Sequence, residues 1–228
     1  MKENKNLMLI IGSPRAKSST SASLGNYLIK KVNNDKFNIK IRYTAVDLKS
    51  AISRSNLLKD VEQADILVLS FPLYVDSLPA PVIRLLDLIE KNQRKTNTKE
   101  KKFLAISNCG FPEAEQNKTA ISICKQFCID SNMEWLGGLM LGMGAAINGK
   151  PLDKAEKIAK NIKLSLELVA ESILNNRKIP EEAFQYIEKP LLKSKFIYKL
   201  FGSISWRIQA FKNRVYSRLD DKPFNNKY

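Results

Sequence analysis

Residues 7–24 read LMLIIGSPRAKSSTSASL, and the organisation of the whole chain can be worked out from this stretch. Five apolar residues lead directly into Gly12, a loop rich in hydroxyl side chains follows, and Leu24, Leu28 and Ile29 then begin a helical pattern. This order predicts a strand, a tight loop and a helix. The unpaired N–H groups and the dipole of a helix favour an anion at its N-terminus, so the stretch predicts a phosphate site.

Strands and helices alternate along the rest of the chain. Further strands are predicted at residues 36–43, 65–70, 102–108 and 135–141, with helical patterns between them. Residues 66–69 are continuously aliphatic, as in a strand buried on both faces, whereas residues 36–43 alternate apolar and polar, as in an edge strand. The pattern predicts an α/β fold with a doubly wound, five-stranded parallel sheet. Three glycines after the fifth strand, Gly142, Gly144 and Gly149, predict a flexible loop there.

Three loops are placed to bind a ligand in such a sheet. Ligands of doubly wound sheets bind at the carboxyl ends of the strands, where the strand order reverses. Loops at residues 12–21, 71–78 and 108–111 follow the first, third and fourth strands. In the strand order 2-1-3-4-5, which flavodoxin has, these three ends lie side by side and bind flavin mononucleotide (FMN).

The sequences of these loops resemble those of a known family. GSPRAKSSTS, which begins at Gly12, resembles the phosphate loop of the NADPH-dependent FMN reductase family, a flavodoxin-like group. ADILVLSFPLYVDSLPAPV, from Ala64, resembles the second flavin loop of that family, and NCGF, from Asn108, is similar to its third. The resemblance covers residues 7–175 and implies a flavodoxin-like fold, bound FMN and a nicotinamide cosubstrate, NADPH or NADH.

The candidate residues of the first loop are donors for a phosphate. Ser13, Ser19, Thr20 and Ser21 can supply hydroxyls beside the backbone N–H groups of the loop. Arg15 adds positive charge there, or reaches a phosphate of a dinucleotide substrate. The alternatives are that the hydroxyls only cap the helix and that Arg15 is a solvated charge.

The candidates in the other two loops would surround the flavin ring. Leu73 and Tyr74 can pack on the ring, and the loop from Pro72 to Ser77 can offer N–H groups to its polar edge. The remaining candidates for the other edge are Asn108, Cys109, Gly110 and Phe111. Tyr74 is also the candidate proton donor, with solvent as the alternative. In the other interpretation Tyr74 is a surface aromatic residue and Cys109 fills the core.

These predictions lead to one enzymatic hypothesis and two alternatives. The first is an FMN-dependent NAD(P)H oxidoreductase that reduces a small acceptor such as a quinone, a nitro compound or free flavin. The second is a flavodoxin-like electron carrier without its own turnover, which the formal charge of +15 disfavours because carriers of this fold are usually acidic. The third is a nucleotide-binding protein without redox function. The family resemblance also implies a homodimer formed across the flavin cleft.

The composition of the chain excludes several kinds of catalytic and metal site. The chain has no histidine, which excludes Ser–His hydrolysis and histidine zinc sites. Cys124 and Cys128 are expected to be buried small hydrophobes and not metal ligands. No cysteine lies between residues 72 and 108, so the iron–sulfur branch of the family is excluded. Three cysteines without a paired framework, and no predicted leader or membrane span, favour the cytoplasm.

A basic, helical C-terminal extension is predicted after the α/β domain. We place the domains at residues 1–178 and 179–228. Residues 191–219 contain seven Lys or Arg and no acid, and their apolar residues recur every three or four positions, which predicts one amphipathic helix or a pair broken near residues 202–205. This segment could pack on its own domain or on a dimer mate, lie on an anionic membrane, or remain a solvated arm. A nucleic-acid partner is not expected.

Overall fold

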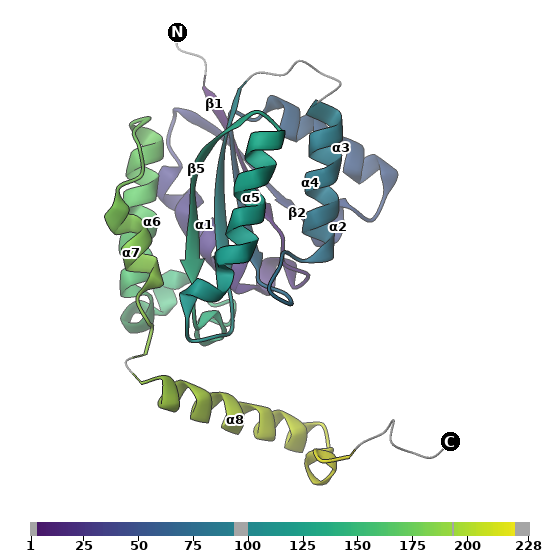
Figure 1. Ribbon diagram of the computed structural model, residues 1–228, viewed down its shortest axis with the longest axis vertical. Helices are drawn as coiled ribbons and strands as arrows, with labels where there is room; N and C mark the ends of the chain where they lie inside the picture. The colour runs from purple at the N-terminus through teal and green to yellow at the C-terminus, as the bar shows by residue number, and fades with distance from the viewer. Residues whose placement is uncertain (1–3, 94–99, 193, 222–228) are drawn as a thin grey trace. The chain divides into compact units, whose positions relative to one another are not determined.

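A five-stranded sheet forms the centre of the fold, and all its strands are parallel in the order β2-β1-β3-β4-β5 (Figure 1). The computed structural model describes residues 4–93, 100–192 and 194–221. The strands are β1 (Lys5–Ile11), β2 (Phe37–Tyr43), β3 (Ile66–Pro72), β4 (Lys101–Asn108) and β5 (Met133–Leu141). The predicted flavodoxin-like α/β fold and its strand order are confirmed.

Helices cover both faces of the sheet. One face carries α1 (Thr20–Val32), α6 (Glu156–Leu174) and α7 (Glu181–Glu188), and the other carries α3 (Ala51–Gln63), α4 (Ala80–Gln93) and α5 (Lys118–Asp130). Short helices complete the connections: α2 (Thr44–Asp47), and the 3-10 helices η1 (Ala16–Ser18), η2 (Ala114–Asn117), η3 (Gly144–Ala146) and η4 (Leu152–Lys154).

Strand β1, which lies inside the sheet between β2 and β3, contributes to both hydrophobic layers. Leu7, Leu9 and Ile11 pack in the layer of α1 and α6, while Met8 and Ile10 pack in the layer of α3 and α4. All five side chains are almost completely buried, and each such burial contributes about 1.5–3 kcal/mol. A strand covered on both faces therefore needs the uninterrupted apolar run seen in the sequence.

Two glycines let helices approach β5 closely. A Cβ atom on Gly137, whose φ is +143°, would lie 2.6 Å from the Phe184 ring of α7. A Cβ atom on Gly138 would lie 2.3 Å from a methyl group of Ile121 in α5. The glycines that interrupt the apolar pattern of this strand are thus explained by the helices packed on both of its faces.

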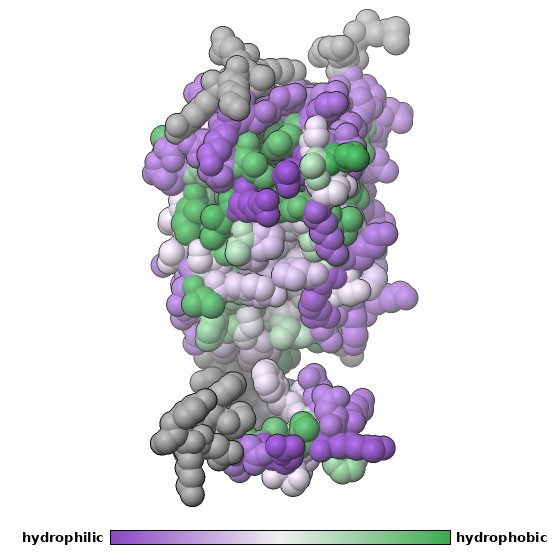
Figure 2. Space-filling view, turned by 90° about the vertical axis from the view of Figure 1, so that its right-hand side faces the viewer, coloured by the Kyte–Doolittle hydropathy of each residue, from purple (hydrophilic) through white to green (hydrophobic). Residues whose placement is uncertain are grey.

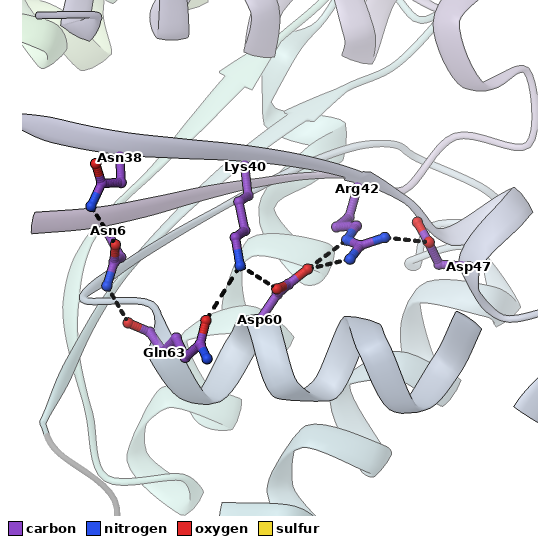
Figure 3. Close-up of polar contacts among 7 residues, drawn as sticks. All are labelled: Asn6, Asn38, Lys40, Arg42, Asp47, Asp60 and Gln63. Atoms are coloured by element: carbon purple, nitrogen blue, oxygen red, sulfur yellow. Dashed lines mark hydrogen bonds and ion pairs between the residues drawn. The ribbon is translucent and has the colours of Figure 1, made fainter. Parts of the chain in front are cut away.

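An ion-pair network joins the edge strand β2 to α3 (Figure 3). The Asp60 carboxylate accepts a hydrogen bond from Lys40 Nζ at 2.5 Å and further bonds from the Arg42 guanidinium, whose Nη1 also lies 3.2 Å from Asp47 Oδ1. Burial by itself raises the pKa of Asp60, but the hydrogen bonds from Lys40 and Arg42 outweigh it and lower that pKa below its ordinary value. The charged network therefore stabilises the position of the edge strand.

The sheet domain extends beyond the boundary predicted at residue 178. The first compact unit runs to Leu191 and includes α7. Ala183 and Ile187 of α7 are completely buried in the same core cluster as Leu166 and Val169 of α6. Because these side chains fill the core, α7 belongs to the α/β unit and not to the basic extension.

Residues 192–228 form a second unit. Its described part contains α8 (Lys195–Lys212) and the 3-10 helix η5 (Tyr216–Arg218). Helix α8 continues through Gly202 without a break, so the prediction of one helix holds over the alternative of two. Figure 2 shows hydrophilic and hydrophobic residues together at the surface of this unit. Within the described ranges, no helix combines the length and the apolar character needed to cross a bilayer.

Candidate functional site

The three predicted loops meet at the carboxyl edge of the sheet. Ile11 at the end of β1 is paired with Ser70 of β3, and Pro72 at the end of β3 is paired with Asn108 at the end of β4. The loops that leave these strands are therefore neighbours. This geometry follows from the strand order, because β1 and β3 adjoin in the sheet although α1, β2 and α3 separate them in the chain.

The hydroxyl groups of the first loop have partners within the protein. Ser19 Oγ accepts from the Ala22 N–H at 3.1 Å and donates to the Ala16 carbonyl at 2.7 Å, so Ser19 is the N-cap of α1. Thr20 Oγ1 donates to the Gly144 carbonyl at 2.9 Å. The helix-cap interpretation thus describes the Ser19 side chain correctly.

Backbone donors remain at the N-terminus of α1. The N–H groups of Thr20 and Ser21, the first two residues of this 13-residue helix, have no acceptor among the residues that the structure describes. Both residues are almost completely buried, with 7% and 1% of their surface exposed. The first N–H groups of a helix have no acceptor within the helix, and an anion bound at the helix N-terminus satisfies them. This arrangement is a cradle suited to a phosphate.

A single side chain connects the three loops. Asn108, at the end of β4, donates from Nδ2 to Ser21 Oγ at 2.8 Å and to the Phe71 carbonyl at 3.0 Å. The backbone carbonyl of Asn108 accepts from the Leu73 N–H at 2.8 Å. Asn108 therefore holds the other two loops in register, and its side chain is used for support inside the protein.

The second loop closes in a tight turn with unusual backbone angles. Tyr74 and Ser77 exchange two backbone hydrogen bonds of 2.9 and 3.0 Å, and the two residues between them have positive φ, 49° for Val75 and 55° for Asp76. Positive φ is rare for a β-branched residue and stores strain. The turn leaves Tyr74 about half exposed and Val75 almost fully exposed, whereas Leu73 and Pro72 are partly buried. An apolar surface thus stands at the edge of the site.

In the third loop, Cys109 is buried whereas the two residues after it are exposed. Cys109 is buried, its Sγ accepts from Asn117 Nδ2 at 3.3 Å, and burial raises the pKa of the thiol above its ordinary value. The thiol therefore stays neutral and packs within its own loop, as the core-filling interpretation predicted. Gly110 and Phe111, in contrast, are exposed at the surface of this loop.

A fourth segment, residues 142–149, lies against the first loop, and this contact was not predicted. It was expected to be flexible, but Arg15 Nη2 donates to Asn148 Oδ1 at 3.3 Å, and Gly144 accepts from Thr20. Gly149 has φ +74°, and a Cβ atom there would lie 2.4 Å from the Ser18 carbonyl. Gly149 therefore allows close packing against the first loop, while Gly142 and Gly144 allow it against residues 108–114. Their position just after a strand end was the available signal.

Two hollows on the surface of the sheet domain lie outside the meeting point of the three loops. One of about 480 Å³ lies at the opposite, amino end of the strands and is lined mainly by polar side chains, among them Asn6, Gln63 and Asp65. A smaller one of about 200 Å³ adjoins the first loop and is lined by Lys17, Tyr27 and neighbouring residues. Among the residues described, no group of three or more potential metal ligands comes together. The candidate is the three-loop edge, where the loops after β1, β3 and β4 meet, because the N–H groups at the start of α1 have no acceptor there among the described residues.

Comparisons with known proteins identify the fold. No family model and no curated protein matches the chain. Among solved structures, an FMN-dependent NADH-azoreductase from Bacillus anthracis in complex with FMN is similar, with 13% identity, 75% of this chain and 100% of that chain covered, and a TM-score of 0.57. An NADH:FMN oxidoreductase matches at 13% identity, with 85% and 99% covered and a TM-score of 0.53.

A flavodoxin, WrbA-like protein from Agrobacterium tumefaciens matches at 10% identity, with 77% of this chain and 100% of that chain covered and a TM-score of 0.52. At these identities the similarity establishes the flavodoxin-like fold of the sheet domain.

Proposed function

We propose that the chain is an FMN-dependent NAD(P)H oxidoreductase with FMN bound at the three-loop edge. The observation that carries this proposal is the pair of N–H groups of Thr20 and Ser21 at the start of α1, which lack an acceptor within the described parts of the chain. They point to an anion at the strand end where flavodoxin-like folds bind the FMN phosphate. The names of the similar structures, an NADH-azoreductase and an NADH:FMN oxidoreductase, support the same class.

Each loop has a defined part in this proposal. The first loop binds the phosphate through its backbone N–H groups and Ser13, while Arg15, held by Asn148, adds charge for this phosphate or for that of the dinucleotide. Leu73 and Tyr74 form the apolar surface against the ring, and backbone N–H groups between Pro72 and Ser77 face its polar edge. Gly110 and Phe111 line the other side of the ring, while Ser19, Asn108 and Cys109 support the loops from within.

The chemistry assigned to the site is hydride and electron transfer, which bound FMN supplies. The protein contributes orientation and a water-poor surface at Leu73, Tyr74 and Phe111. With no histidine in the chain, the Tyr74 hydroxyl or solvent delivers the proton to the reduced acceptor. We propose a small oxidised molecule such as a quinone, a nitro compound or free flavin as the acceptor, with NADPH or NADH as the donor.

A proline substitution tests the phosphate cradle directly. Thr20 is the first residue of α1, where proline is tolerated, and Ser19 before it has extended angles (φ −108°, ψ 154°) that suit a following proline. Thr20→Pro removes the N–H donor, whereas Thr20→Ala keeps it and removes only the hydroxyl. A hydrogen bond to a charged group is worth about 1.5–3 kcal/mol, so Thr20→Pro should bind FMN roughly 10- to 100-fold more weakly than Thr20→Ala.

The measurement is fluorescence titration of FMN with each variant. A purified wild-type protein that is colourless and does not bind FMN refutes the proposal, and equal affinities of the two variants refute the placement of the phosphate. If FMN binds, oxidation of NADPH or NADH under air identifies an enzyme. Bound FMN without such turnover would instead indicate a flavodoxin-like electron carrier.

We also propose a homodimer in the cytoplasm. The exposed apolar residues Tyr74, Val75 and Phe111 lie in the loops of the site, where a second copy would cover them and the flavin edge. Three free, buried cysteines agree with a reducing compartment. Sedimentation velocity tests the dimer: Val75→Glu, which places a charge on a 98% exposed residue, should give monomers if this edge is the interface.

A further inference from the structure

The C-terminal helix α8 carries an apolar face that is open to its surroundings. Phe196, Leu200, Ile204, Ile208 and Phe211 follow one another at spacings of four, four, four and three residues, which places them on one side of the helix. Their exposed fractions range from 44% to 75%. A face of this kind costs free energy in water and is suited to a partner.

The segment that contains this helix is strongly basic. Residues 191–219 contain seven Lys or Arg and no Asp or Glu. By their helical positions, Arg207 and Lys212 lie near opposite edges of the apolar face, while Ser205 and Gln209 lie on the other side of the helix. Trp206 is 78% exposed and lies beside Gln209, away from the apolar face, so it is not part of that face.

We propose that α8 docks in the plane of an anionic lipid bilayer surface, with its apolar face in the acyl boundary and its cations among the headgroups. A basic helix with one apolar face is the form that binds such interfaces. The helix has 18 residues and is about 27 Å long, and the cations around its apolar face favour a position along the surface. Docking of α8 is independent of FMN binding at the sheet edge.

Other partners fit this helix less well. The phosphate backbone of a nucleic acid would neutralise the cations but offer nothing to the five apolar side chains. A second copy of α8 would cover the apolar face but would bring together two segments that each carry seven positive charges. The first unit has its own core, whose buried members lie between Leu7 and Ile187. An anionic bilayer satisfies both the charge and the apolar face.

Co-sedimentation of the full chain with lipid vesicles tests the proposal. We expect binding to phosphatidylcholine vesicles that contain about one third phosphatidylglycerol at about 0.15 M salt, at least tenfold weaker binding to pure phosphatidylcholine, and release at about 1 M salt. Each cation near an anionic surface contributes about fivefold in partitioning, so Arg207→Gln/Lys212→Gln should weaken binding more than tenfold.

Two neutral double variants separate the apolar face from charge. Ile204→Gln/Ile208→Gln alters the apolar face and should weaken vesicle binding more than tenfold. Ser205→Gln/Gln209→Asn alters the opposite face without changing charge and should bind as the wild type does. The thermal melting of the sheet domain should be the same in all variants, which checks that each is folded.

Absence of vesicle binding by the full chain would by itself overturn the proposal, and three more specific results would also do so. The first is equal vesicle binding by the two neutral double variants. The second is absence of vesicle binding together with a dimer that dissociates in Ile204→Gln/Ile208→Gln, which would identify a second copy as the partner. The third is absence of vesicle binding together with tight binding to duplex DNA, which would identify a nucleic acid.

Discussion

Replacing Asn108 by alanine tests whether one side chain holds the carboxyl edge of the sheet together. Its Nδ2 donates to Ser21 Oγ at 2.8 Å and to the Phe71 carbonyl at 3.0 Å, and the residue is only 6% exposed. Each such bond contributes about 1 kcal/mol net, and a buried acceptor left unpaired costs about 1–3 kcal/mol. We therefore expect Asn108→Ala to lower the free energy of unfolding by about 2–4 kcal/mol.

Thermal unfolding followed by circular dichroism measures this loss. In a domain of this size, about 1 kcal/mol shifts the melting temperature by roughly 2–4 °C, so a drop of roughly 5–15 °C is expected. Asn175→Ala is the matched control, because the Asn175 amide also donates to a backbone carbonyl, that of Glu171 at 3.0 Å, but does so in solvent. Its effect should stay within about 0.5 kcal/mol.

A double-variant cycle then assigns the effect to the contact itself. Ser21→Ala removes the hydroxyl that accepts from Asn108, so the two substitutions should be non-additive by about 1 kcal/mol. Strict additivity, or an Asn108→Ala protein that melts with the wild type, would contradict the role given to this side chain. FMN titration of the same variants should show weaker binding in Asn108→Ala if the loops form the proposed site.

Three further predictions concern other parts of the sheet domain. The pKa of Asp60 is lowered in the folded state, so the contribution of this carboxylate to stability is present above the unfolded pKa of about 4 and is lost as the pH falls through the folded value. Urea unfolding of Asp60→Asn at neutral pH should therefore show a loss of about 1–3 kcal/mol in the free energy of unfolding, and this loss should shrink below about pH 4. A loss that does not depend on pH would be inconsistent with this reasoning. Lys101 is 1% exposed, and its Nζ donates to two backbone carbonyls at the end of α3. In chemical unfolding, Lys101→Met should therefore lower the free energy of unfolding by about 2–3 kcal/mol. The control Lys102→Met, which removes a surface ion pair, should lower it by less than about 1 kcal/mol. Gly149→Ala would place a Cβ atom 2.4 Å from the Ser18 carbonyl at a positive φ, so we expect about 1–3 kcal/mol of destabilisation by calorimetry, and a wild-type melting temperature would argue against tight packing of this segment.

Local sequence determined the strands, the helices and the loops that could carry a site. The apolar run in β1 reports burial on both faces, and the alternation in β2 reports an edge, because side-chain direction follows directly from the period of the backbone. The hydroxyl-rich loop before α1 was recognisable as the N-terminus of a helix, because Ser and Thr side chains accept hydrogen bonds from the first N–H groups of a helix. These features depend on neighbours a few residues away, so the sequence shows them without the fold.

The tertiary structure decided which groups at the site are free and which are committed. Thr20 bonds to Gly144, which lies 124 residues away in the chain, and Asn108 bonds to Ser21 across 87 residues. Such partners depend on how strands and helices pack, so no local pattern reveals them. The packing also assigned α7 to the sheet domain and brought residues 142–149 against the first loop. It leaves the N–H groups of Thr20 and Ser21 without an acceptor among the described residues, whereas it commits the hydroxyls of Ser19 and Thr20 to backbone carbonyls.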